Sequence, residues 1–184
     1  MLLCSEILIA IYRFLPLLQN RLYMAKLYIN KDIVADKDKM ENWYLTGEEG
    51  LSFPDIQNFL SWIDPNDHVI DIEIHSCGGD AVEGYAIYDA LRASGKQISC
   101  TAVGRCASMA TVILLAAAKE RRFAYPHAKF LIHKPYMASY DGDLDLETLE
   151  SIKSNLESEK NKMLALYVER TGSEASVIEA QMNK

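Results

Sequence analysis

Residues 98–110 read Ile-Ser-Cys-Thr-Ala-Val-Gly-Arg-Cys-Ala-Ser-Met-Ala, and they decide the expected fold. The β-branched run before Gly104 predicts a strand, and the helix-forming residues from Met109 to Lys119 predict a helix. Ser108 stands at the sharp turn between them, where the first N–H groups of the helix lack partners and the helix dipole is positive. A serine at such a junction suits either a nucleophile or a helix N-cap, and this stretch alone leaves both readings open.

Strand and helix patterns alternate on both sides of this turn. Isoleucine at every second position predicts a half-buried strand over 68–75. We expect a first strand after Met24, further strands at 97–103, 122–125 and 129–133, and helices from 53 (cap Ser52), over 81–94, over 146–170 and from 173 (cap Ser173). Such alternation predicts an α/β fold. The charged stretch 31–50 matches no motif, and we expect it to be exposed.

The long helix predicted over 146–170 has apolar residues at heptad-like spacing. They are Leu149, Ile152, Leu156, Met163 and Leu166. This pattern, with a charged opposite face, predicts a projecting helix that packs against a second long helix. No later segment of the chain could supply that helix, so we expect it to come from another subunit.

Composition sets limits on function. The chain has 184 residues with a net charge of −7, which argues against nucleic acid as a partner. The four cysteines lack metal-ligand spacing and indicate reduced thiols in a cytoplasmic protein, with Cys106 a packed thiol. The apolar run 1–18 is broken by charges and a proline, so we expect no stable membrane insertion. We interpret 1–24 as an N-terminal extension of uncertain status, either upstream readthrough or a docking arm, and 25–184 as one domain.

Three predicted strand ends carry residues suited to acyl transfer. They are the Gly78-Gly79 pair, Ser108 with Met109, and His133 followed two residues later by Pro135. Strand ends on one side of such a sheet form a common crevice, so we expect these residues to meet there. His133 would take the serine proton, and backbone N–H groups would stabilise an oxyanion. His75 is the nearest alternative base, but its place before the glycine pair suggests that it braces the turn.

The chain resembles the Clp protease proteolytic subunit family from about Val69 to Gly172. The resemblance rests on Ile74–Gly79, Gly84–Asp89, Gly104–Ala110, Tyr125–Ala128 and Ile132–Pro135. It implies a crotonase-like α/β fold, with a repeated β-β-α head and a long projecting handle helix. It also implies serine endopeptidase activity inside stacked homo-oligomeric rings.

The family motifs carry the nucleophile to Ser108 and the base to His133. They carry the oxyanion amides to Gly79 and Met109, and place Gly78 and Pro135 beside the substrate. No metal or cofactor is implied. Because the sequence has no phosphate-binding loop, any ATP use would belong to a partner such as an AAA+ unfoldase, which would deliver protein substrates.

The sequence departs from the family pattern near this site. His75 and Cys77 stand where asparagine and proline are usual, and Ala110 follows Met109 where the family typically has glycine. The triad aspartate would fall near Gln181 or between it and the chain end, where no residue is acidic. We expect either a sequence lacking its C-terminal part, which we favour, or a short form without the carboxylate that orients the histidine.

Three alternatives stay open beside a housekeeping peptidase. One is a prophage capsid-maturation protease on the same fold, favoured by the unmatched N-terminal region and by His75 and Cys77. A second is a catalytically incomplete subunit that builds rings with an active paralogue. The third is a crotonase-type acyl-CoA enzyme, which would not need Ser108 or the Ile-His-Lys-Pro motif.

Overall fold

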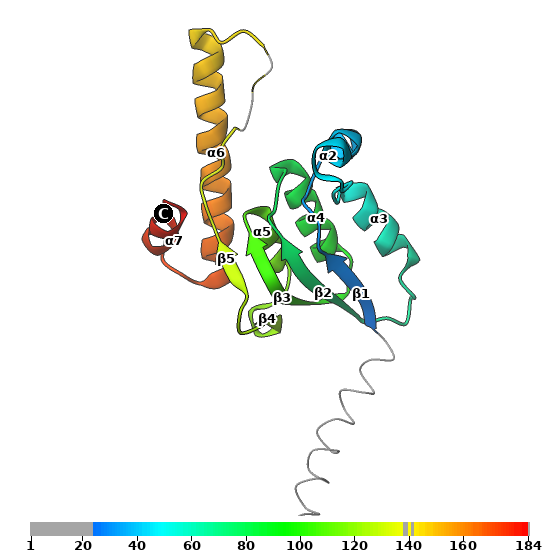
Figure 1. The fold of residues 1–184 in the computed structure, drawn as a ribbon. Coiled ribbons are helices and arrows are strands. Elements are labelled where there is room, and N and C mark those ends of the chain that lie inside the picture. The colour runs from blue at the N-terminus through cyan, green and yellow to red at the C-terminus, as the bar shows by residue number, and fades with distance from the viewer. Residues whose placement is uncertain (1–23, 138–139, 141, 184) are drawn as a thin grey trace, which may run out of the picture.

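The computed structural model describes residues 24–137, 140 and 142–183. A parallel sheet forms its centre, in the order β1 (Met24–Ile29), β2 (Val69–Ser76), β3 (Gln97–Ala107) and β4 (Arg122–Ala124), with β5 (Lys129–Leu131) pairing with the far end of β3. Figure 1 shows the sheet with helices packed around it and one long helix rising beyond it. The predicted α/β class is therefore confirmed.

Helices connect and cover the strands. They are α2 (Lys39–Thr46), α3 (Phe53–Trp62), α4 (Ala81–Ala93), α5 (Met109–Leu114), α6 (Leu146–Thr171) and α7 (Ala175–Met182), with the short 3₁₀ turns η2 (Asp36–Asp38) and η3 (Lys119–Arg121). Ser52 caps α3 as predicted, because its hydroxyl and the Asp55 carboxylate form a capping box.

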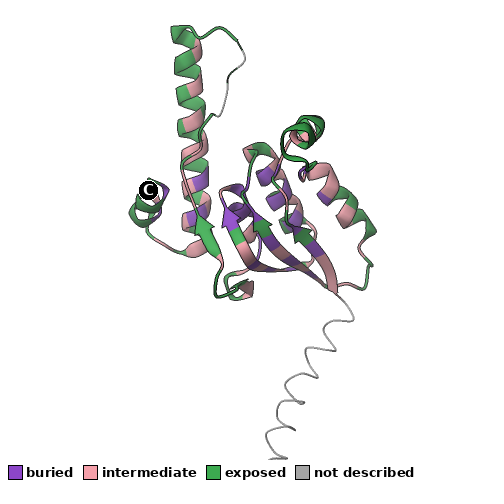
Figure 2. Cartoon of the chain, viewed as in Figure 1, coloured by how far each residue is buried: buried purple, intermediate pink, exposed green. Residues whose placement is uncertain are grey.

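The core follows the alternation seen in the sequence. Every second residue of β2 is buried, with Ile70, Ile72 and Ile74 fully so, and these side chains pack with the buried residues of β3, α4 and α5. Figure 2 shows these buried positions gathered at the sheet, whereas the outer half of α6 carries only exposed and half-buried positions. Only Met163 and Tyr167 of α6 are buried, both in its C-terminal half.

Several predicted boundaries were wrong, each for a physical reason. Strand β3 runs past Gly104 to Ala107, because β5 pairs with its last three residues. Helix α5 ends at Leu114 and not at Lys119. The guanidinium groups of Arg122 and Arg170 donate to the carbonyls of Leu115 and Ala117, so those acceptors need no further helical turn.

Other differences concern the ends of the chain and the polar stretch. Glu174, and not Ser173, is the N-cap residue of α7. Strand β5 ends at Leu131, so His133 lies in the following loop. The stretch 31–50 contains helix α2, none of whose residues is buried, but the expectation that the whole stretch is exposed was wrong, because Ile33 and Gly50 are buried. The expectation for residues 1–23 lies outside the described residues.

Candidate active site

Ser108 occupies a strained turn between β3 and α5. Its φ of +52° and ψ of −128° make it the only non-glycine residue with positive φ in the described part of the chain. Such a conformation costs on the order of 1–3 kcal/mol and is characteristic of functional turns. The Ser108 N–H donates to the Leu131 carbonyl at 2.8 Å, which ties the turn to the end of β5. Its side chain makes no capping hydrogen bond, so the N-cap alternative does not explain this serine.

The glycine pair packs directly against this turn. A Cβ at Gly78 would lie 2.5 Å from the Ala107 carbonyl oxygen and 2.8 Å from the Ser108 Cβ, so only glycine allows the approach. Gly79 has a φ of +142°, and a Cβ there would lie 2.0 Å from the Ile33 carbonyl oxygen. The close packing on both sides fixes the glycine turn beside Ser108.

Ile33 holds the glycine turn through its backbone. Its N–H donates to the Gly78 carbonyl and its carbonyl accepts from the Asp80 N–H, both at 2.8 Å. The Gly78 carbonyl and the Gly79 N–H belong to one planar trans peptide group and point in opposite directions, so the Gly79 N–H points away from Ile33. No sequence motif singles out Ile33; its signal is the short apolar run Ile33-Val34-Ala35 within an otherwise charged stretch.

Two backbone amides are available near Ser108. Met109 is the first residue of α5, where an N–H has no helical acceptor. No acceptor for the N–H of Met109 or Gly79 is found among the residues that the structure describes. These are the two N–H groups to which the resemblance to the Clp protease proteolytic subunit family carries the oxyanion site, and that role stays a prediction.

His133 is held by its own loop. Its Nδ1 lies 2.6 Å from the Lys134 carbonyl oxygen, and its ring lies 5.4 Å from the ring of Tyr136. Because a carbonyl oxygen can only accept, Nδ1 must be the donor, and Nε2 of the neutral ring is then an acceptor. The Lys134 N–H donates in turn to the Met182 carbonyl at 3.3 Å, so α7 is tied to this loop.

One cleft of about 760 Å³ brings the predicted site residues together. Its lining includes Ser108, His133, Gly78, Gly79, Met109 and Pro135. The roles assigned to these residues stay predictions. The residues themselves follow the ends of β2, β3 and β5 and line one cleft, as expected. His75 does not line this cleft.

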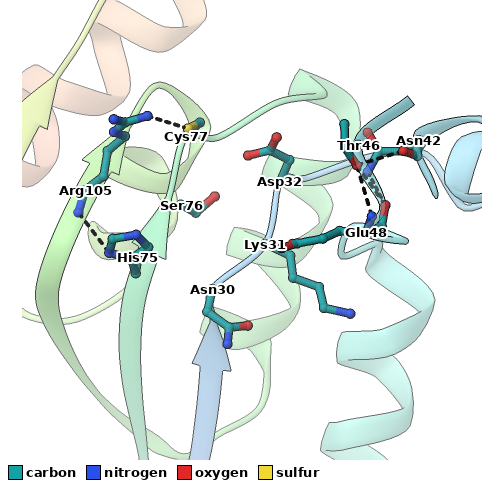
Figure 3. A pocket seen from close by; sticks show the side chains of 10 residues that line it. All are labelled: Asn30, Lys31, Asp32, Asn42, Thr46, Glu48, His75, Ser76, Cys77 and Arg105. Atoms are coloured by element: carbon teal, nitrogen blue, oxygen red, sulfur yellow. Dashed lines mark hydrogen bonds between the residues drawn. The ribbon is translucent and has the colours of Figure 1, made fainter. Parts of the chain in front are cut away.

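A second, polar pocket of about 320 Å³ shares Cys77 with the cleft (Figure 3). The Arg105 guanidinium donates to the Cys77 Sγ at 3.1 Å, and the Arg105 N–H donates to the His75 Nδ1 at 3.3 Å. A Cβ at Gly104 would lie 2.1 Å from that same Nδ1, so Gly104 makes room for the imidazole. His75 thus contacts the end of β3 and not Ser108.

The buried thiols are not suited to nucleophilic chemistry. Burial raises the pKa of Cys100 and of Cys106 to about 12, so both stay protonated near neutral pH. Cys106 is fully buried, which confirms that it is a packed thiol. Cys77 is exposed.

No carboxylate forms an ion pair with His133 within the described residues. In the same part of the chain, no group of acidic, histidine or cysteine side chains is arranged to hold a metal ion. No described helix is long and apolar enough to cross a membrane.

The fold and this cleft define an α/β protein with a serine at a strained strand-to-helix turn. Residues 55–184 match the sequence model of the Clp protease family, so the chain belongs to that family. The ATP-dependent Clp protease proteolytic subunit 1 of Chlamydia muridarum is 32% identical over 130 residues, which span 68% of this chain and 65% of that protein. The proteolytic subunit of Porphyromonas gingivalis is 37% identical over 102 residues, 53% of this chain and 46% of that protein.

A solved structure shows the same fold. A point mutant of ClpP1 from Listeria monocytogenes superposes with a TM-score of 0.67 at 20% identity, covering 94% of this chain and 84% of that one. The chain matches less than two thirds of the length of the first curated relatives. Its resemblance to the Clp protease proteolytic subunit, predicted from the motifs, is confirmed.

Proposed function

We propose that this protein is a serine endopeptidase subunit that hydrolyses peptide bonds of unfolded or partner-delivered proteins inside a ring assembly. The observation that carries the proposal is the strained backbone of Ser108, which lies with His133 and the glycine turn in one cleft. Membership of the Clp protease family supports the same chemistry.

The reaction follows from the groups present. His133 Nε2 accepts the Ser108 hydroxyl proton as Oγ attacks the peptide carbonyl carbon. The carbonyl oxygen becomes an oxyanion, which the N–H groups of Gly79 and Met109 stabilise. The imidazolium then gives its proton to the leaving amine as the C–N bond breaks. Water hydrolyses the resulting ester by the same steps, which restores Ser108.

Gly78 and Pro135 shape the approach of the substrate. The missing Cβ of Gly78 lets the glycine turn lie directly against Ala107 and Ser108, which places the turn along the cleft where the substrate would bind. Pro135 lines the cleft two residues after the base and fixes the direction of that loop. Neither group takes part in proton transfer.

The outer half of α6, residues 146–158, has no buried residue, and this supports assembly into stacked rings. Leu146 and Leu149 are exposed in the described structure, although Leu149 belongs to the heptad-like face. A second copy could cover them, as the handle helices would do between rings. An AAA+ unfoldase would supply the ATP-driven delivery of substrates.

The test is hydrolysis of an unfolded protein, such as casein, by the protein at its natural length, with and without a candidate unfoldase. We expect Ser108→Ala to reduce hydrolysis at least about a thousandfold. Ser61→Ala is the matched control, because that hydroxyl lies on α3 and bonds only to the Asn58 carbonyl in the described structure. Activity that survives Ser108→Ala would contradict the proposal.

A catalytically incomplete ring subunit is the second candidate. It is favoured by one observation, the absence of a carboxylate partner for His133 among the described residues. Mixed rings with an active paralogue in native mass spectrometry, together with no Ser108-dependent hydrolysis, would support this candidate.

A further inference from the structure

Residues 32–45 form one wall of the cleft that holds Ser108. Eight cleft-lining residues come from this segment, which contains η2 and most of α2. The segment precedes residues 55–184, the part that matches the Clp protease family. This wall is therefore a place where the chain can set its own substrate preference.

The charge of the cleft is one-sided. Its lining includes the carboxylates of Asp32, Asp38, Glu41 and Asp80 but no lysine or arginine. The Asp80 carboxylate already has a partner, because it accepts a hydrogen bond from the Glu83 N–H as the N-cap of α4. Asp32 lies within the electrostatic influence of Arg105. Two carboxylates of the wall, Asp38 and Glu41, stay uncompensated.

In the described structure, the nearby cations do not pair with Asp38 or Glu41, and Lys37, which precedes Asp38 in the chain, is exposed and does not line the cleft. Lys39 forms ion pairs with Asp36 at 3.0 Å and with Asp55 at 2.7 Å. Lys31 and Arg105 line the polar pocket, and Figure 3 shows Arg105 turned toward Cys77. Within the described residues, no lysine or arginine lies at ion-pair distance from Asp38 or Glu41.

We propose that Asp38 and Glu41 make the cleft select polypeptides with a lysine or arginine side chain near the cleaved bond. The inference rests on the proposed peptidase function. The cationic head would meet the two carboxylates, while Leu45 of the same wall offers apolar surface to the methylene stem. Because Asp38 and Glu41 are both exposed, the preference for a cationic side chain is moderate and weakens with salt.

The test compares pairs of peptides in which one peptide has a lysine where the other has a norleucine. Successive pairs place this residue at each position around the cleaved bond. We expect kcat/KM to favour the best-placed lysine by about tenfold at low salt. The double variant Asp38→Asn, Glu41→Gln should reduce this preference to about twofold or less. Glu49→Gln is the matched control, since it removes an exposed charge just after α2 and outside the cleft lining.

A binding measurement separates this inference from the proposed function. Fluorescence anisotropy of labelled peptides on the Ser108→Ala protein should show the same lysine preference without hydrolysis. Equal affinity for both peptides, no measurable binding of the lysine peptide, or a preference that survives the double variant would overturn the inference. Lysine-selective binding without Ser108-dependent hydrolysis in the unsubstituted protein would instead overturn the peptidase function alone.

Discussion

The Nδ1 of His133 lies 2.6 Å from the carbonyl oxygen of Lys134, the next residue along the chain. A backbone acceptor thus holds the proton on Nδ1, which leaves Nε2 as the basic nitrogen. A carbonyl can fix the tautomer in this way. Being neutral, it stabilises the imidazolium less than a carboxylate would.

The tautomer of His133 can be observed directly. We expect the long-range ¹H–¹⁵N spectrum of the ¹⁵N-histidine protein, recorded at pH 8, to show His133 as the Nδ1–H form. His133→Ala assigns the signals by their loss. An Nε2–H form as the main species would be inconsistent with the Lys134 contact.

The close packing of Gly79 against Ile33 should contribute to the stability of the fold, whether or not the protein is catalytic. Gly79→Ala places a Cβ 2.0 Å from the Ile33 carbonyl oxygen, so we expect a loss of at least about 3 kcal/mol in the free energy of unfolding. Gly47→Ala is the control, because Gly47 has a φ of +81° with no atom near its Cβ position. It should cost only about 1–2 kcal/mol. Urea unfolding that gives the two variants equal stability would refute the packing described here.

The cysteines should differ strongly in reactivity. We expect iodoacetamide at pH 8 to modify Cys77, which is exposed and accepts a hydrogen bond from Arg105. Cys100 and Cys106 should stay unmodified in the folded protein, because burial raises the pKa of each to about 12. Peptide mass mapping reads out each site separately. Rapid modification of Cys106 would show that the core around it opens.

Helix α7 should be sensitive to acid through one ion pair. The hydrogen bond from Lys160, at 2.7 Å, lowers the pKa of Glu179 below its ordinary value of 4.5. A lowered folded-state pKa contributes stability above the unfolded-state pKa, and this contribution is lost as the pH falls through the folded-state pKa. We therefore expect Glu179→Gln to destabilise the protein at pH 7 and to have less effect near pH 3.

The control for that measurement is Glu169→Gln, a carboxylate on α6 for which no ion pair is found in the described structure. Urea midpoints of the three proteins between pH 7 and pH 3 give the comparison. An effect of Glu179→Gln that does not change with pH would mean that the Lys160 contact does not contribute to stability.

Much of the fold and of the site arrangement could be predicted from local sequence. The alternating isoleucines of β2 reveal its buried face, and a serine after a β-branched run reveals the turn at Ser108. These signals are local, because side-chain alternation and helix starts depend on neighbouring residues.

The parts that escaped prediction depend on contacts distant in sequence. Strand β3 is extended by pairing with β5, and α5 is ended by Arg122 and Arg170. Ile33 reaches the glycine turn from a distant part of the chain, by backbone hydrogen bonds that its side chain does not reveal. The acidic residues of the wall formed by 32–45 line the cleft only because these contacts bring that segment beside the glycine turn.

The central claim, that Ser108 is an activated nucleophile, is tested most directly by a fluorophosphonate probe with mass mapping of the adduct. Applied to the protein at its natural length, the probe should give one adduct, on the peptide that contains Ser108. The adduct should disappear in Ser108→Ala and form far more slowly in His133→Ala, while Ser61→Ala leaves it unchanged. No adduct on the folded protein, or an adduct that persists in Ser108→Ala, would contradict the account.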